Sequence, residues 1–349
     1  MILAASLALA LGGPAEAAEV PVSADGHAIN PTWSKDGKWL AFEVNQYEGS
    51  VDLYVVQVEN GQAMGSPRKV EVPGSSSSFA SGGSIAAGAV WHPEGTLIFE
   101  GSSSGTDSRL YFWSPGGARA SQLLSASQIG GDLTWPTITA DGGTLAFVSD
   151  STGDGDIYTW KQATNEVANA AKSGFSEMAP RFNKDGSSVA YSRKNQGGED
   201  LFVLSGGSSV PRIGGNGDQS RPNWADGGAV VFFTNERGDQ RWDIGVSRGP
   251  GDKKTIAKDV RLPLRAAPSL SDDGRWVAWG TSVPEKAGKI YVTRVDGSKT
   301  VELSTGLVAA GEPSLVTAGG RTWLAYTALP SDTAAWRQLH IMDITGKVP

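Results

Sequence analysis

The sequence predicts an all-β protein built as a single β-propeller, with seven four-stranded blades by count and six as the alternative. Three observations support this fold class. A short phrase recurs along the chain, each copy holds a tight-turn signal between two apolar runs, and the mature region lacks the 3.6-residue periodicity of helices. A repeat with a fixed period of this kind indicates the overall architecture, whatever the role of any single residue.

Each copy of the phrase begins with Pro or Ala and contains an apolar residue, a turn pair such as Asp-Gly, and an apolar triplet. In the first copy these parts are Pro31, Trp33, Asp36-Gly37 and residues 40–42. The copies begin at Pro31, Ala89, Pro136, Pro180, Pro222, Pro268 and Pro313. Their spacing is close to the ~40–50 residues of a propeller blade.

Each copy predicts two strands joined by a hairpin, because the turn requires a positive φ that Gly adopts without a Cβ clash. A third strand follows, often opening with a charge before an apolar-aromatic pair, as in Asp52-Leu-Tyr54. A weaker fourth strand then leads to the next copy. Such units, repeated radially, form a propeller. We expect them near residues 27–72, 88–125, 132–170, 177–213, 219–258, 266–304 and 311–345.

The two ends of the chain carry separate signals. The last unit supplies only three strands, so the segment after residue 17 is expected to add the fourth and close the ring. Residues 1–17 hold an apolar run too short to span a bilayer, followed by the small-x-small pattern Ala15-Glu-Ala17. We therefore expect a signal peptide over 1–17 and a propeller over 18–349, exported to the periplasm, soluble and not membrane-spanning after cleavage.

The composition narrows the classes of partner and chemistry. The chain has 30 basic and 37 acidic residues, a net charge of −7 and no cysteine. Phosphate binding favours a basic surface, so a nucleic-acid partner is not expected. The lack of cysteine excludes disulfides, thiolate catalysis, iron–sulfur clusters and a lipid-modified cysteine.

The residue types of common catalytic centres are scattered or incomplete. His27, His92 and His340 are far apart in sequence, whereas an imidazole metal site needs clustered histidines. The string around Ser84 lacks the last glycine of a nucleophile elbow, and no pair of carboxylates is placed for glycoside chemistry. The sequence therefore predicts that the protein is not an enzyme and needs no cofactor.

One oxygen-rich loop is a candidate for a structural calcium ion. Asp150, Asp154 and Asp156 alternate with small residues, and such loops can wrap a hard cation. The alternative is a polar connection between the second and third strands of a unit.

The repeated phrase, followed by Asp-Ile/Leu-Tyr, resembles the repeat of TolB-type propellers over about residues 27–345. Residues 235–244 also resemble the loop before the third strand in that family. The resemblance implies a periplasmic protein-interaction scaffold, a monomer or a subunit of a Tol-Pal-like cell-envelope complex. Similar repeats occur in propellers of prolyl-oligopeptidase-type peptidases and in uronate lyases.

Two surfaces are candidates for binding partners. Residues flanking the repeated proline are expected to line the central opening: Asn30, Thr134, Ala179, Arg221, Ala267 and Glu312. Loops between the second and third strands, around residues 46–52, 105–109, 196–200 and 235–243, form the other surface and include Arg237 and Trp242. The alternative function is binding of carbohydrate or cell-wall fragments, with Trp113, Trp160, Trp242 and Trp336 stacking on sugars. A propeller lyase or hydrolase is the third alternative, ranked after these two.

Overall fold

The computed structural model describes residues 17–22, 25–46, 49–73, 84–102 and 106–348. The predicted signal peptide lies outside these residues except for Ala17. Within the described ranges the regular structure is strand, apart from the short 3₁₀ turns η1 (Asp226–Gly228) and η2 (Pro284–Lys286). No helix in these ranges is long and apolar enough to cross a membrane.

The described strands form five antiparallel sheets of four strands and one sheet of nine. The nine-stranded sheet holds β2 (His27–Trp33), β3 (Trp39–Asn45), β4 (Val51–Glu59), β5 (Gln62–Ala63), β6 (Arg68–Lys69), β7 (Ile85–Trp91), β8 (Leu97–Ser102), β9 (Arg109–Trp113) and β10 (Ser121–Gln122). It consists of two antiparallel groups joined by one parallel pair, Val51 with Ile85.

The other sheets follow in chain order. The next holds β11 (Leu133–Ile138), β12 (Thr144–Ser149), β13 (Asp156–Lys161) and β14 (Glu166–Ala171); then come β15 (Glu177–Phe182), β16 (Ser188–Asn195), β17 (Gly198–Ser205) and β18 (Ser208–Ile213). The next sheet holds β19 (Gln219–Trp224), β20 (Val230–Thr234), β21 (Trp242–Ser247) and β22 (Lys254–Val260). The sheet after it holds β23 (Ser269–Leu270), β24 (Trp276–Gly280), β25 (Lys289–Arg294) and β26 (Thr300–Ser304). The last joins β27 (Val308–Ala318), β28 (Arg321–Leu329) and β29 (Gln338–Asp343) to β1 (Ala18–Val20).

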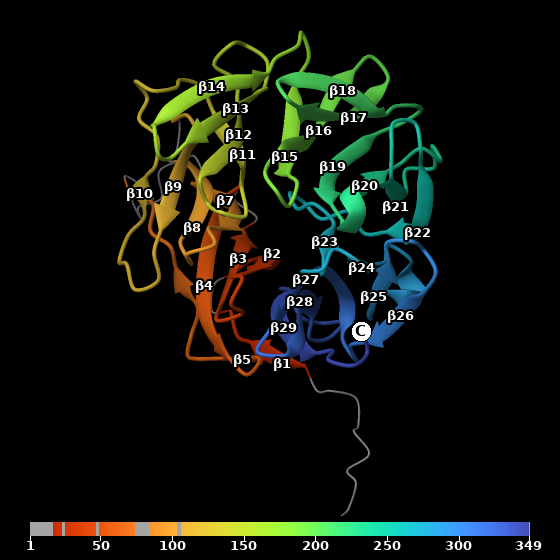
Figure 1. The fold of residues 1–349 in the computed structure, drawn as a ribbon. Helices are drawn as coiled ribbons and strands as arrows, with labels where there is room; N and C mark the ends of the chain where they lie inside the picture. Colours follow the sequence, from red (N-terminus) through yellow and green to blue (C-terminus); the bar gives the residue numbers. More distant parts are fainter. Residues whose placement is uncertain (1–16, 23–24, 47–48, 74–83, 103–105, 349) are drawn as a thin grey trace, which may run out of the picture.

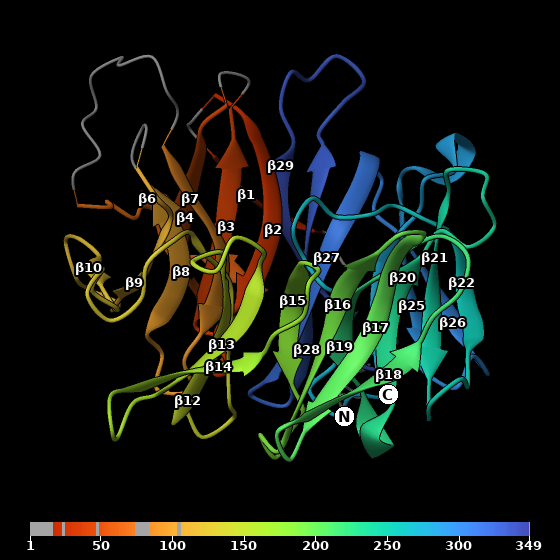
Figure 2. The same cartoon turned by 90° about the horizontal axis from the view of Figure 1, so that it is seen from above.

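The sheets are arranged radially, with the first strand of each group nearest the centre (Figure 1). Figure 2, turned by 90°, shows neighbouring sheets side by side with strands running between the two faces of the molecule. This all-β arrangement of four-stranded antiparallel units is a propeller architecture, as the repeat predicts.

The N-terminal segment supplies the fourth strand of the last sheet, as predicted. Ala18 and Val20 pair antiparallel with Ile341 and Leu339 of β29, so the first strand completes the sheet formed by the last three. Val20 is fully buried in the adjoining core. The backbone amide of Val22 extends the contact by donating to Gln338 Oε1 over 3.0 Å.

The core repeats one cross-strand aromatic contact. The aromatic residue of the apolar triplet stacks on the residue paired with it in the third strand, as Phe42 does on Tyr54 at 5.8 Å between ring centroids. The other stacked pairs are Phe99–Tyr111, Phe147–Tyr158, Tyr191–Phe202, Trp279–Tyr291 and Tyr326–His340. In the group of β19–β22 the partner is Gly245, and a Cβ there would meet the Phe232 ring at 2.5 Å. Each aromatic pair adds about 0.5–1.5 kcal/mol beyond area burial.

Candidate binding cavity at the centre of the sheets

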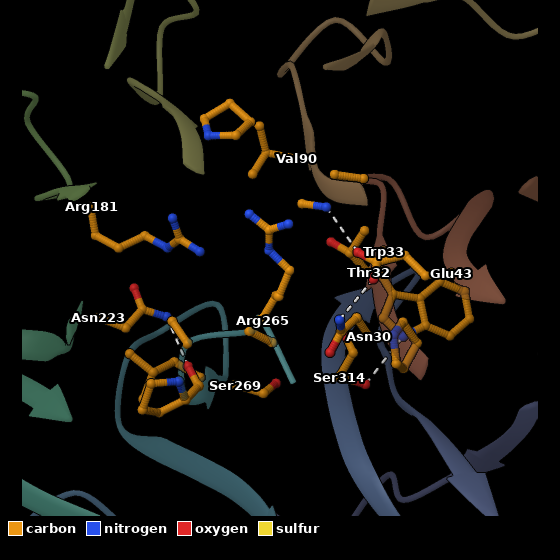
Figure 3. A pocket seen from close by; sticks show the side chains of 18 of the residues that line it. Asn30, Thr32, Trp33, Glu43, Val90, Arg181, Asn223, Arg265, Ser269 and Ser314 are labelled. Carbon is orange, nitrogen blue, oxygen red and sulfur yellow. Dashed lines mark hydrogen bonds between the residues drawn. The ribbon is translucent and has the colours of Figure 1, made fainter. Parts of the chain in front are cut away.

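A cavity of about 280 Å³ lies where the first strands of the sheets converge. Its walls come from β2, β7, β11, β15, β19, β23 and β27, and from the segment between β22 and β23 that carries Arg265. Figure 3 shows the guanidinium groups of Arg181 and Arg265 pointing into this space from different walls, near the amide of Asn223.

The backbone around the cavity is strained in a repeated way. The residue before the repeated proline has a positive φ of 50–54° at Asn30, Trp135, Ala179, Arg221 and Glu312. Non-glycine residues rarely adopt this region, and a following proline disfavours it further. Such strain persists only where the surrounding structure enforces it, and strained residues cluster at functional sites. The five positions therefore indicate that the cavity is a candidate functional site.

The residues at this position also tie neighbouring strand groups together. The backbone amide of Gly88 donates to Glu43 Oε1 over 2.8 Å, that of Trp135 to Glu100 Oε2 over 3.0 Å, and that of Arg221 to Ser192 Oγ over 2.9 Å. In each case the acceptor lies on the second strand of the preceding group. The two carboxyl groups on the cavity wall are therefore fixed by backbone donors of the next strand group.

Arg181 is the charged residue of this wall that lacks an ionic partner. It occupies the position after the repeated proline, and its Nη1 donates to its neighbour's carbonyl, Pro180 O, over 2.9 Å. Among the described residues no carboxylate lies within ion-pair distance of it. Burial lowers the pKa of its guanidinium to about 10, so it stays charged at neutral pH.

Arg265, by contrast, is paired. Its Nη1 lies 2.5 Å from Oε1 of Glu100, a carboxylate that is 1% exposed. Burial raises the pKa of Glu100, and the Arg265 charge opposes that rise. The Arg265 guanidinium also lies 5.4 Å from the centre of the Trp135 ring, which Arg221 approaches at 5.9 Å. Such cation–π contacts stabilise the two guanidinium groups against the Trp135 ring.

Glu43 is a second buried carboxyl group, without an ionic partner among the described residues. It is 2% exposed and accepts hydrogen bonds from the Gly88 amide and, over 2.9 Å, from Asn30 Nδ2. Burial is the main cause that raises its pKa to about 7, helped by the nearby charge of Glu100. The cavity therefore holds two guanidinium groups and two buried carboxyl groups, of which Glu43 is partly protonated near neutral pH.

A second, wider cavity of about 940 Å³ opens at the face that carries the hairpin turns. The two cavities are lined by consecutive residues of the same strands: Val90 and Trp91, Arg181 and Phe182, Asn223 and Trp224. Trp91 and Trp224 are partly exposed, and their indole Nε1 atoms donate to Thr32 O over 3.0 Å and Arg181 O over 2.9 Å. The polar cavity thus continues into a mouth lined with aromatic rings.

The structure places four of the predicted partner-binding residues at this centre. Asn30 and Ala267 line the cavity, and the backbone amide of Asn30 donates to Glu312 Oε2 over 3.2 Å. Glu312 lines a small neighbouring cavity, and Arg221 lies over Trp135. In the third copy the residue before the proline is Trp135, so Thr134 was placed one position too early.

Arg237 and the four predicted tryptophans lie away from the cavity. Arg237 forms ion pairs with Asp243 at 2.9 Å and Asp259 at 2.8 Å. Trp242 packs at the edge of an apolar core cluster. Trp113 is 2% exposed, so it cannot stack on a sugar, while Trp160 and Trp336 are partly exposed outside the two cavities.

Two of the three aspartates in the predicted calcium loop bind separate protein groups. Asp150 Oδ1 accepts from the Asp132 amide over 2.7 Å, and buried Asp156 accepts from Thr152 Oγ1 over 2.6 Å and from Asn169 Nδ2 over 3.0 Å. Asp154 is exposed. Within the ranges that the structure covers, no group of three or more His, Cys, Asp or Glu could hold a metal ion. Calcium at this loop stays a prediction.

Sequence reasoning missed Glu43, Glu100, Arg181 and Arg265. For three of them a signal exists, because they break the pattern of the repeat. Only the first two copies have Glu after the triplet aromatic, and only the fourth has a charged residue directly after the repeated proline. Arg265 lies on a segment outside the phrase, and no local pattern marks it.

No family model matches the chain, and no curated protein matches its sequence. Solved structures do match. TolB from Acinetobacter baumannii aligns at a TM-score of 0.57 and 15% identity, over 80% of this chain and 67% of that one. Oligogalacturonate lyase from Vibrio parahaemolyticus aligns at 0.62 and 13%, over 93% and 91%. A puromycin-hydrolysing peptidase from Mycobacterium tuberculosis aligns at 0.62 and 14%, over 92% of this chain and 55% of the peptidase.

These enzymes overturn the prediction that the protein is not an enzyme. The lyase matches over nearly its whole length, so this propeller fold by itself can form the body of an enzyme. The prediction rested on missing Ser, His and metal-site patterns and on the lack of paired carboxylates. It overlooked that Glu43 and Glu100, from two neighbouring strand groups, line one cavity.

At these identities the likeness concerns the fold, and it agrees with the repeat in sequence and with the observed sheets. The chain has a TolB-like propeller fold.

Proposed function

We propose that the central cavity binds a carboxylate-bearing sugar oligomer, a uronate oligomer, as its substrate. The observation that carries this proposal is the guanidinium of Arg181, which points into the cavity without an ionic partner among the described residues. A guanidinium presents donors in a planar fork that matches a carboxylate, and desolvation at the cavity wall strengthens the pairing.

The shape of the two cavities supports a sugar oligomer over a single small anion. The aromatic mouth begins one residue after the polar cavity on each of three strands. Its rings belong to Trp91, Phe182 and Trp224, which are partly exposed. Aromatic rings offer flat apolar faces on which sugar rings can stack. The substrate class is that of the oligogalacturonate lyase, which has a similar fold.

The cavity also holds groups suited to proton transfer. A carboxyl group with a pKa near the working pH can both take and give a proton, and Glu43 is of this kind. Glu100 is buried beside it and held by Arg265. We assign these two carboxyl groups as the candidates for acid–base chemistry on the bound oligomer.

Calorimetric titration with trigalacturonate tests the proposal, with its methyl ester as the uncharged control ligand. We expect binding of the acid, little binding of the ester, and a loss of about ten- to a hundredfold in affinity for Arg181→Gln, the range of a charge-assisted hydrogen bond. Arg294→Gln, which changes an exposed side chain at the end of β25, is the matched control and should bind normally. Equal binding of acid and ester would refute the proposal. Chromatography of the incubated oligomer then tests for cleavage.

A second candidate function is binding of a protein partner in the periplasm, as the TolB resemblance implies. The wide mouth supports it, because about 940 Å³ can admit a peptide segment and Lys35, Lys184 and Asp272 border it. An affinity capture from envelope extract tests this function. Stoichiometric recovery of one outer-membrane lipoprotein, lost with Lys184→Glu and kept with Arg294→Gln, would support it, and recovery unaffected by Lys184→Glu would oppose this surface.

Both candidates assume a ring of seven blades that β1 closes. We infer this ring from the seven copies of the phrase, the pairing of β1 with β29, and the contact of Trp33 Nε1 with Ser314 O over 3.2 Å, which links the first and last groups.

A further inference from the structure

Glu43 differs from the other acidic group of the cavity in how its charge is balanced. Glu100 has Arg265 at 2.5 Å, whereas Glu43 has two uncharged donors, the Gly88 amide and Asn30 Nδ2. A carboxylate buried without a counter-charge is costly, and protonation relieves that cost. The packing around Glu43 therefore favours its neutral form more than the packing around Glu100 does.

The side chain of Asn30 can form a hydrogen bond with Glu43 whether Glu43 is ionised or protonated. Its Nδ2 donates to Glu43 Oε2, while its Oδ1 is buried and has no hydrogen-bond partner among the described residues. Rotating the amide by half a turn brings Oδ1 to the carboxyl group, where it accepts a hydrogen bond from a protonated Oε2. The unpartnered oxygen is explained if the carboxyl group is neutral for part of the time.

The charged and titratable groups that face Glu43 come from several elements. Glu100 on β8 repels its ionised form, and Arg265 on the segment after β22 attracts it more weakly. Glu312 on β27 accepts the Asn30 amide, and its own pKa is raised to about 7 by burial. Arg181 lines the same cavity from β15. An ionised Glu43 lowers the positive charge available to an anionic ligand.

We propose that Glu43 is the proton-binding residue of this site and that a carboxylate-bearing ligand binds together with one proton held on Glu43. The inference rests on the proposed function and adds that the affinity for the ligand depends on pH. With Glu43 protonated, the cavity keeps an unopposed Arg181 for the ligand. With Glu43 ionised, a second buried negative charge on the same wall competes with the ligand's carboxylate.

The experiment is calorimetric titration of the full chain with trigalacturonate at about pH 6 and about pH 8. We expect the affinity to fall about tenfold over this interval, because the protonated fraction of a group with a pKa near 7 falls by about that factor. At about pH 7, repeating the titration in buffers of different ionisation enthalpy should show net proton uptake on binding.

Two variants separate the cause from a general effect of pH. Glu43→Gln mimics the neutral acid and should bind at both pH values with the affinity that the wild type shows at the lower one, without proton uptake. Glu177→Gln removes another carboxyl group with a pKa near 7, outside the cavity, and should keep the pH dependence. Thermal melting confirms that both variants fold.

The outcomes are distinct. Binding that does not vary with pH, or that varies equally in Glu43→Gln, overturns the role of Glu43 and leaves the uronate site intact. Absence of trigalacturonate binding at either pH overturns the proposed function and this inference with it.

Discussion

The indole of Trp224 donates a hydrogen bond from Nε1 to the main-chain oxygen of Arg181 over 2.9 Å, joining the first strands of two neighbouring sheets at the cavity wall. Trp33 and Trp91 make equivalent contacts to Ser314 O and Thr32 O. In these three strand groups the tryptophan therefore links the first strand to the first strand of the preceding group. At Arg181 the same link also fixes the backbone of the residue that we assign to anion binding.

Replacing Trp224 with Phe should cost about 1 kcal/mol in the free energy of unfolding, the net value of one hydrogen bond. It should also weaken uronate binding a fewfold, because the backbone of Arg181 loses its tether. Urea unfolding and calorimetry measure the two effects. Trp160→Phe also removes an indole hydrogen bond, to Asn165 Oδ1 on the exposed hairpin, and should leave binding unchanged. An effect of equal size on binding in that control would contradict the argument.

Arg265→Gln should destabilise the fold by about 3 kcal/mol, because it leaves the buried Glu100 without its ionic partner. Urea unfolding at neutral pH measures this loss. The double variant with Glu100→Gln should recover most of the lost stability, since the uncompensated charge is then absent. If the double variant is as unstable as the single one, the loss comes from packing of the arginine and not from the pair.

Glu177→Gln tests the pH dependence of stability at a second buried carboxyl group. Burial raises the pKa of Glu177 from 4.5 to about 7, and Asp156 beside it adds to the rise. The folded state thus holds a proton that the unfolded state loses above about pH 4.5, so this contribution is largest in acid and is lost as the pH rises to about 7. Between acid and about pH 8, the free energy of unfolding of the variant should fall by up to about 3 kcal/mol less than that of the wild type. The variant should therefore be more stable than the wild type at about pH 8.

Thermal melting across this pH range, followed by circular dichroism, measures the effect. Glu166→Gln is the control, because Glu166 lies exposed on β14 beside Lys161. An unchanged pH profile in Glu177→Gln would show that this carboxyl group is ionised in the folded protein throughout the range.

Deletion of residues 18–24 should lower the melting temperature of the whole fold and promote self-association. The deletion removes β1, exposes the edge of β29 and uncovers the core around Val20. Calorimetry and size-exclusion chromatography check the two effects. Glu19→Ala, which alters an exposed side chain of the same strand, should leave both unchanged. A deletion variant with the melting temperature of the full chain would refute this role of β1.

The sequence by itself determined the strand pattern. The phrase from Pro31 onward places a turn pair and a buried triplet at fixed offsets, and both signals are local. The same logic located the pairing of the N-terminal strand, because a three-stranded last unit leaves an edge to fill. The cross-strand aromatic pairs depend in addition on the observed register, which sets Phe42 opposite Tyr54.

The tertiary structure alone decided the chemistry of the centre. Glu43, Glu100, Arg181 and Arg265 come from four parts of the chain, and no local spacing predicts that they share one cavity. The charge state of each depends on how neighbouring sheets bury it and which donors they supply, as the Gly88 amide does for Glu43. Strand periodicity is a property of a few adjacent residues, whereas desolvation and charge pairing arise only when the sheets assemble around a common centre.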